Sequence, residues 1–174
     1  MSKALDWGSL RVLCIDENKS YGRLVERMLR DLTIRDITLV FSEDEAREQF
    51  NDASFDYVIM NCSPEGDRVS ELTEFLRNKS DTPAPNIPVI WTVDAGTIEQ
   101  ITTAIRHGAD HVLIKPVSVG DIESTLKGLH ETPTLKTDVA NYIGPCRRRL
   151  PARVYGPFAG QDRRDGEKDM AEAS

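Results

Sequence analysis

Apolar and polar positions along the chain follow two alternating patterns, which predict strands and helices in turn. Short, continuously apolar runs recur five times, and such runs are typical of parallel strands covered on both faces. After each run, apolar residues recur at helical spacing with charged residues on the opposite side. The predicted strands are residues 11–15, 37–41, 57–60, 87–93 and 111–114, and the predicted helices are about 21–32, 42–50, 67–76, 97–107 and 118–129. Strand–helix units at this spacing predict an α/β fold with a doubly wound, five-stranded parallel sheet and five helices on its two faces.

Four of these helices carry end signals in the sequence. Ser42 stands three residues before Glu45, which is the spacing of a capping box. Asp67 and Ser118 are suited to cap the helices that follow them. Gly108 follows the fourth helix, where a glycine can adopt the left-handed conformation that ends a helix.

Polar side chains stand at the ends of the predicted strands. The apolar run Tyr57–Met60 delivers Asn61 to a loop, because Ser63–Gly66 contains a turn signal that forbids continuation of the strand. In open parallel sheets, chemistry collects at the carboxyl ends of the strands. The side chains expected to converge at this rim belong to Asp16, Glu17, Asn61, Thr92, Val93 and Lys115.

Two adjacent acids, an amide and a lysine would form an anionic pocket with one fixed cation. Such a pocket suits Mg²⁺, which prefers oxygen ligands, and its lysine suits a phosphoryl oxygen. A simpler alternative stays open, in which Asp16 and Glu17 cap the first helix and Lys115 merely pairs with them.

The length of 174 residues, with 39% hydrophobic and 29% charged residues, predicts one domain with appendages. We expect an N-terminal arm over residues 1–9, a domain over 10–131 and a tail over 132–174. The apolar runs are far shorter than the ~20 residues of a membrane span, and the N-terminus lacks a signal-peptide pattern. We therefore expect a soluble, cytoplasmic protein that does not bind membranes. Three cysteines without metal spacing indicate no disulfide framework.

The tail is rich in Pro, Gly and Arg and poor in aliphatic residues. It cannot bury enough surface to offset the entropy of ordering, so we expect disorder. Two related elements, Tyr142–Pro145 and Tyr155–Pro157, are each followed by arginines and indicate a short linear motif. The residues of this tail motif are Tyr142, Gly144, Pro145, Arg147, Arg148, Arg149 and Tyr155.

The net charge of −7 is distributed unevenly. From Pro133 onward there are eight Lys and Arg against six Asp and Glu, whereas residues 1–132 hold 14 against 23, a net charge of −9. An acidic domain argues against nucleic acid as its main ligand. A nucleic-acid or nucleotide binder driven by the tail, through Arg147–Arg149 and Arg153, stays open as an alternative, because arginine-rich segments can fold on RNA.

Four separated motifs give a more specific interpretation. They are Arg11–Asn18, Asp56–Gly66, Pro88–Thr92 and Gly108–Pro116. In order and spacing they resemble the receiver domain of bacterial two-component response regulators, over about residues 10–131. The resemblance implies the flavodoxin-like (CheY-like) fold, in agreement with the architecture that the periodicity predicts.

In that family an acidic pair holds Mg²⁺, an aspartate that ends the third strand accepts a phosphoryl group from a histidine kinase, and a lysine pairs with the phosphoryl group. The resemblance places the acidic pair, and with it any metal, at Asp16 and Glu17. It places the phosphoacceptor position at Asn61 and the pocket lysine at Lys115.

Three positions depart from the family pattern. The hydroxyl position falls on Val93, with Thr92 one residue earlier, and the aromatic switch position falls on Val112. Asn61 is an amide, which cannot act as the carboxylate nucleophile. With one anionic ligand removed, we expect Mg²⁺ to bind only weakly and no cofactor to be required. The chain is thus similar to a pseudo-receiver, with the fold kept and the switch chemistry lost.

We therefore expect a single-domain pseudo-receiver of a two-component or phosphorelay system. It would act as a phosphorylation-independent protein–protein interaction module and not as an enzyme. The resemblance implies docking through the fourth helix, fifth strand and fifth helix, or through the tail. The expected partner is another signalling protein, namely a histidine kinase, a response regulator or an output protein. One further alternative stays open, a receiver that still switches because Lys115 holds a phosphoryl group or small anion non-covalently, or because it binds metal.

Overall fold

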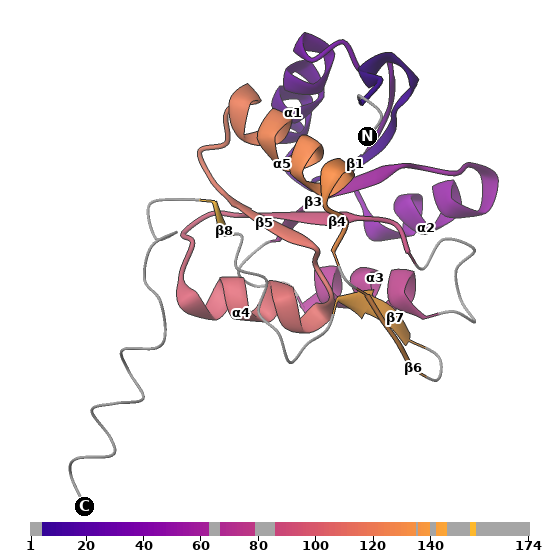
Figure 1. Ribbon diagram of the computed structural model, residues 1–174, viewed down its shortest axis with the longest axis vertical. Helices are drawn as coiled ribbons and strands as arrows, with labels where there is room; N and C mark the ends of the chain where they lie inside the picture. The colour runs from indigo at the N-terminus through magenta and orange to yellow at the C-terminus, as the bar shows by residue number, and fades with distance from the viewer. Residues whose placement is uncertain are drawn as a thin grey trace, which may run out of the picture.

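The computed structural model describes residues 5–62, 67–78, 86–134, 136–139, 142–145 and 154–155. Its centre is a parallel sheet with the strand order β2-β1-β3-β4-β5-β8 (Figure 1). The first five strands along the chain are β1 (Arg11–Ile15), β2 (Asp36–Val40), β3 (Tyr57–Cys62), β4 (Val89–Val93) and β5 (His111–Ile114). The helices are the short η1 (Trp7–Ser9), α1 (Lys19–Asp31), α2 (Glu43–Asp52), α3 (Asp67–Arg77), α4 (Ile98–His107) and α5 (Val119–Glu131). The parallel pairing of β1 to β5 confirms the predicted doubly wound sheet.

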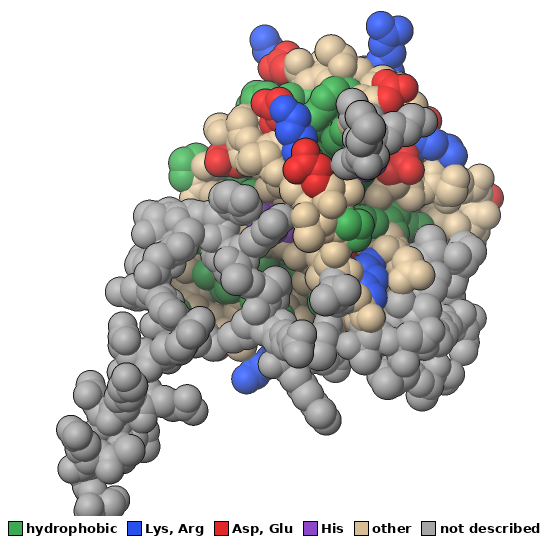
Figure 2. Space-filling view, viewed as in Figure 1, with side chains coloured by type: hydrophobic (Ala, Val, Ile, Leu, Met, Phe, Trp, Pro, Cys, Tyr) green, Lys and Arg blue, Asp and Glu red, His purple; other side chains and the backbone are tan. Residues whose placement is uncertain are grey.

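Helices cover both faces of the sheet, and each face buries its own apolar cluster (Figure 1). On one face α1 and α5 contribute Val25, Leu29, Ile122 and Leu126, and on the other face α2, α3 and α4 contribute Ala46, Phe50, Leu72, Leu76 and Ala104. Charged side chains of both signs lie on the outer side of α1 and α5 (Figure 2), as expected of amphipathic surface helices. No helix in the described part of the chain is long and apolar enough to cross a bilayer.

Most capping signals of the sequence are confirmed. The Ser42 side chain accepts a hydrogen bond from the first turn of α2, and Ser118 forms a capping box with Asp121 at the start of α5. Gly108 ends α4 in the left-handed conformation with a φ of 100°. The structure differs at Asp67, which is the first residue of α3 and not the residue before it.

Three short strands lie within residues 132–174, for which the sequence predicts a disordered tail. Lys136–Val139 (β6) pairs antiparallel with Tyr142–Pro145 (β7), and β7 lies against α3 (Figure 1). Val154–Tyr155 (β8) adds a sixth strand parallel to β5. The other tail positions, residues 135, 140–141, 146–153 and 156–174, lie outside the described residues.

A buried ion pair explains why the start of this segment is ordered. Arg77 and Asp110 are buried, and Arg77 Nη2 lies 2.6 Å from Asp110 Oδ2. Arg77 also donates hydrogen bonds to the carbonyl oxygen of Gly108. Lys136 places its ammonium 3.7 Å from the second oxygen of Asp110 and donates to the carbonyl oxygen of Asn86. One long side chain therefore anchors β6 to the end of the sheet where β4 begins.

We predict that this anchor makes stability depend on pH in the alkaline range. Burial lowers the pKa of Lys136 from 10.5 to about 8, although Asp110 opposes the shift. Between these two values the unfolded chain binds the proton and the folded chain does not, so the free energy of unfolding rises with pH, by at most about 3 kcal/mol. Urea titrations of wild type and Lys136→Met across this window measure the difference.

The difference between wild type and Lys136→Met should grow in favour of wild type as the pH rises from about 8 to 10.5. Lys127→Met, which removes an exposed lysine of α5, controls for the loss of a surface positive charge. A difference that stays flat or falls across the window would contradict the lowered pKa of Lys136 in the folded protein.

Candidate functional site

Asn61 lies near the carboxyl end of β3 and joins two charged side chains from neighbouring strands. Its amide nitrogen Nδ2 donates a hydrogen bond of 3.3 Å to Oδ1 of Asp16, which directly follows β1. Its amide oxygen Oδ1 accepts a hydrogen bond of 2.6 Å from Nζ of Lys115, which directly follows β5. The predicted convergence of Asp16, Asn61 and Lys115 at one rim is therefore what the fold produces.

Lys115 has a second anionic partner that the sequence interpretation missed. Its Nζ lies 2.7 Å from Oδ1 of Asp94, the residue directly after β4. The same Nζ lies 4.3 Å from the centroid of the Tyr21 ring, within the range of a cation–π contact. Lys115 is 14% exposed, whereas Asp94 is half exposed at the edge of the site. The sequence could have indicated this partner, since Asp94 is an acid that directly follows the predicted strand 87–93.

The expected acidic pair divides into one buried and one exposed side chain. Asp16 is 6% exposed, and its Oδ1 also accepts a hydrogen bond of 2.8 Å from the backbone N–H of Asn18. Burial raises the pKa of Asp16 above its usual value, while the Asn18 hydrogen bond and Lys115 act in the opposite direction. Glu17 is exposed and forms no hydrogen bond or ion pair with the described residues. The alternative in which these two acids cap the first helix is wrong, because Asn18 caps α1.

The residues at the hydroxyl and aromatic positions face the interior. Thr92 is buried, and its hydroxyl donates to the carbonyl oxygen of Met60 at 3.4 Å. Val93 and Val112 are buried in the apolar cluster beneath α2, α3 and α4. None of these three side chains presents a hydroxyl or an aromatic ring to Lys115.

Residues 12–127 match the response regulator receiver domain. The chain belongs to this family. It is a receiver domain of two-component systems, in which receiver domains act with other signalling proteins such as kinases and response regulators. Chemotaxis protein CheY-3 of Vibrio cholerae is 22% identical to it over 123 residues, 71% of this chain and 93% of that protein. The two-component response regulator ARR3 of Arabidopsis thaliana is 26% identical over 133 residues, 70% of this chain and 56% of that protein.

Solved receiver structures share the fold of this receiver domain. The signal receiver domain of the DNA binding response regulator merR from Colwellia psychrerythraea superposes with a TM-score of 0.62 and 22% identity, and the match covers 71% of this chain and all of that one (100%). The receiver domain of the Francisella response regulator 1452 gives a TM-score of 0.59 and 24% identity, with 71% and 98% covered. At these identities the similarity establishes the fold alone.

The described residues of the tail motif lie in strands β7 and β8. Tyr142, Gly144 and Pro145 belong to β7, where Gly144 and Pro145 are buried, and Tyr155 belongs to β8. Arg147, Arg148 and Arg149 lie outside the described residues. The first of the two elements, Tyr142–Pro145, is therefore a strand that contacts α3.

The rim does not fit a divalent cation of the kind that the family's acidic pair holds. Mg²⁺ takes several oxygen ligands, but the Asn61 oxygen accepts from an ammonium group and Asp16 Oδ1 accepts from two N–H groups. Within the described ranges, no three His, Cys, Asp or Glu side chains are arranged to hold a metal ion. The function proposed below accordingly uses no metal.

We predict that Asn61→Asp lowers the stability of the metal-free protein. The new carboxylate would face Asp16 in place of an N–H donor, and Lys115 would offset only part of the repulsion, so the free energy of unfolding should fall by about 1–2 kcal/mol at neutral pH. The folded-state pKa of the new acid would be raised, so the loss should disappear as the pH falls towards about 4, the pKa of an unfolded Asp. Urea denaturation at both pH values measures this change.

Added Mg²⁺ should restore part of the stability of Asn61→Asp, since three acids would then surround one site. Asn61→Ala is the matched control, because it removes the same hydrogen bonds without adding charge and should respond neither to Mg²⁺ nor to this pH change. A metal-free Asn61→Asp protein as stable as wild type at neutral pH would show that charge repulsion does not shape this rim.

Proposed function

We propose that this receiver domain is a pseudo-receiver, a phosphorylation-independent protein–protein interaction module of a two-component or phosphorelay system. The observation that carries the proposal is the position of Asn61, whose amide occupies the acceptor position and bonds both Asp16 and Lys115. An amide is not a nucleophile for phosphoryl transfer, whereas a carboxylate is. The fold is retained in full around a side chain that cannot form an acyl phosphate.

The arrangement of Lys115 also supports the proposal. In a working receiver the lysine pairs with the incoming phosphoryl group, whereas here its charge is already paired with Asp94 at 2.7 Å. A phosphoryl group or another small anion would have to displace this carboxylate from a charge-assisted hydrogen bond. The alternative of a non-covalent anion switch therefore requires the opening of an existing ion pair.

The loop between β4 and α4 is held by contacts at each of its residues. After Asp94, the backbone N–H of Ala95 donates to the side-chain oxygen of Gln100 at 3.3 Å, and Thr97 caps α4. Gly96 has a φ of +58°, and a side chain there would lie 2.7 Å from the Cδ1 atom of Ile114. The loop is thus positioned without a ligand, which favours one persistent conformation of the neighbouring α4.

An exposed apolar side chain on α4 supports docking through this side of the domain. Sequence periodicity places Ile98 on the core stripe of its helix, but Ile98, the first residue of α4, is 72% exposed. Exposed aliphatic side chains on a receiver's α4–β5–α5 side are suited to anchor a signalling partner. The edge of β5 is paired with β8, so the surface offered to a partner is formed mainly by α4 and α5.

We expect no phosphorylation of the wild-type protein by acetyl phosphate or a histidine kinase, because Asn61 lacks the nucleophile. Intact-mass measurement should show no added phosphoryl group. Asn61→Asp should be labelled only partially, since Val93 offers no hydroxyl and Val112 no aromatic ring. Stoichiometric labelling of Asn61→Asp, with amide shift changes across α4 and β5, would show that the site is one substitution from a working switch.

We also expect the partner to bind through Ile98. A signalling protein that the purified chain retains from its native cell would be expressed and its affinity measured against wild type and Ile98→Asp. The substitution should weaken binding by about tenfold or more, because a charge replaces an apolar anchor. An acid in the first turn of α4 favours the helix, so the variant should remain folded.

Leu24→Asp is the matched control for this measurement, because Leu24 is 44% exposed on α1, on the other face of the sheet. It should leave the affinity within about twofold of wild type. Acetyl phosphate should not change the affinity of any variant. A partner that binds only after phosphorylation, or that is equally sensitive to both substitutions, would overturn the proposed function.

A further inference from the structure

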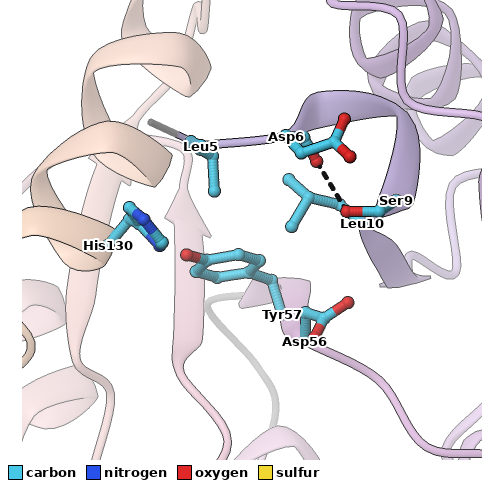
Figure 3. A pocket seen from close by; sticks show the side chains of 7 residues that line it. All are labelled: Leu5, Asp6, Ser9, Leu10, Asp56, Tyr57 and His130. Atoms are coloured by element: carbon cyan, nitrogen blue, oxygen red, sulfur yellow. Dashed lines mark hydrogen bonds between the residues drawn. The ribbon is translucent and has the colours of Figure 1, made fainter. Parts of the chain in front are cut away.

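A pocket of about 270 Å³ lies between the N-terminal arm and the last turn of α5, over the start of β3 (Figure 3). Tyr57 is the first residue of β3, whereas Asn61 lies at the opposite end of the same strand. Successive strand residues advance by about 3.3 Å, so the pocket and the rim are roughly 13 Å apart along the sheet. The pocket therefore belongs to a different part of the molecule from the site already described.

The Tyr57 side chain brings an unused polar group into this pocket. Tyr57 is 5% exposed, and Figure 3 shows its hydroxyl directed into the pocket towards His130. Within the described part of the chain, no residue forms a hydrogen bond with this hydroxyl. A bound group could therefore form a hydrogen bond with this hydroxyl in place of water. Burial, followed by the charge of Asp56, raises the pKa of Tyr57, so the phenol keeps its proton and can donate it.

Two carboxylates give the pocket a negative character. Asp6 and Asp56 line it, and each has one oxygen bonded to a backbone N–H, from Gly8 at 3.2 Å and from Arg11 at 2.8 Å. Neither forms an ion pair with the described residues. The guanidinium of Arg11 is directed elsewhere and pairs with Asp36 at 3.0 Å. No lysine or arginine is among the described residues that line the pocket.

The remaining wall is apolar. Leu10, which is buried, and Leu5 lie beside the ring of Tyr57, between the carboxylates on one side and the Tyr57 hydroxyl with His130 on the other (Figure 3). An apolar middle with a negative end and a hydrogen-bonding end suits a molecule that has a positive charge, a short apolar body and a hydroxyl group.

We propose that this pocket binds a small organic amine, with its ammonium at Asp56, its apolar body on Leu5, Leu10 and the Tyr57 ring, and a polar group at the Tyr57 hydroxyl. Such a ligand would tie the arm to α5, where Trp7 already lies 5.8 Å from the ammonium of Lys127. The site is independent of the proposed function, because it uses no residue of the rim. Binding at this site would allow a small molecule to regulate a domain that, in the proposed function, is no longer regulated by phosphorylation.

Titration of the full chain with tyramine, followed by amide chemical shifts, tests the proposal. The shifts should concentrate at Leu10, Tyr57 and His130. 4-Ethylphenol, which lacks the amine, should bind about tenfold more weakly, because it forfeits a charge-assisted contact. Phenethylamine, which lacks the hydroxyl, should bind about three- to tenfold more weakly, as expected for one neutral hydrogen bond.

Isosteric variants separate binding from folding. Asp56→Asn keeps an oxygen acceptor for the Arg11 backbone N–H and should weaken tyramine binding about tenfold. Tyr57→Phe should weaken tyramine binding as much as the loss of the ligand hydroxyl does. Asp52→Asn, which changes an exposed carboxylate at the end of α2, on the other face of the sheet from α5, is the charge-matched control and should leave tyramine affinity unchanged.

The proposal is overturned if tyramine does not bind, or if it binds no more tightly than 4-ethylphenol. Equal affinity for wild type and Asp56→Asn would also overturn it, as would shifts centred on Asn61 and Lys115. A native-like amide spectrum of Asp56→Asn confirms that any loss of binding reflects the pocket. Failure here would leave the proposed interaction function untouched, because that function is tested through Ile98.

Discussion

The rim of the sheet depends on the ammonium group of Lys115. It donates to the Asn61 amide and pairs with Asp94, and Asn61 in turn donates to the buried Asp16. These contacts link the ends of β1, β3, β4 and β5 through one continuous chain of hydrogen bonds. Because the amide adds no charge, the ammonium of Lys115 faces two carboxylates, those of Asp16 and Asp94, and these three groups carry a net charge of −1. An aspartate in place of Asn61 would make this charge −2.

The opposite end of the sheet has a second polar network with a different purpose. The buried pair of Arg77 and Asp110 joins α3 to the start of β5, and Lys136 extends the network to the strand that follows α5. A buried ion pair is stabilised only when its remaining hydrogen-bonding groups are satisfied, and here backbone carbonyl oxygens satisfy Arg77. Charged groups thus fix the side chains of the rim at one end of the sheet and attach an extra segment at the other.

The strands and helices were predictable because parallel strands covered on both faces are apolar throughout, and because capping residues mark the helix ends. Asp16, Asn61 and Lys115 were predictable because each follows or ends a strand. Asp94 has the same position, but its role appears only when the distance to Lys115 is known. Helical periodicity could not place Ile98 outside the core, since it reports the side of a helix that a residue occupies and not the tertiary contacts that cover it.

The ordered part of the tail was missed for a different physical reason. Composition averages over many residues, whereas Lys136 orders β6 through one side chain that reaches a buried carboxylate. The pocket at Tyr57 was likewise invisible in the sequence, because it is formed by the arm, β3 and α5, which are far apart along the chain. Both the order of β6 and the pocket at Tyr57 depend on contacts between segments that are distant in the sequence, which the local pattern of residues does not report.

The pairing of β8 with β5 means that the edge of the sheet already has an occupant. Val154–Tyr155 belongs to the same chain as β5, and a segment linked to its site within one chain meets that site at an effective concentration that reaches the millimolar range. A strand from another protein present at micromolar concentration would have to bind the bare edge roughly 10³-fold more tightly than the tail does to replace it. The tail therefore sets an affinity threshold for partners that add a strand, while partners that dock on helices meet no such competitor.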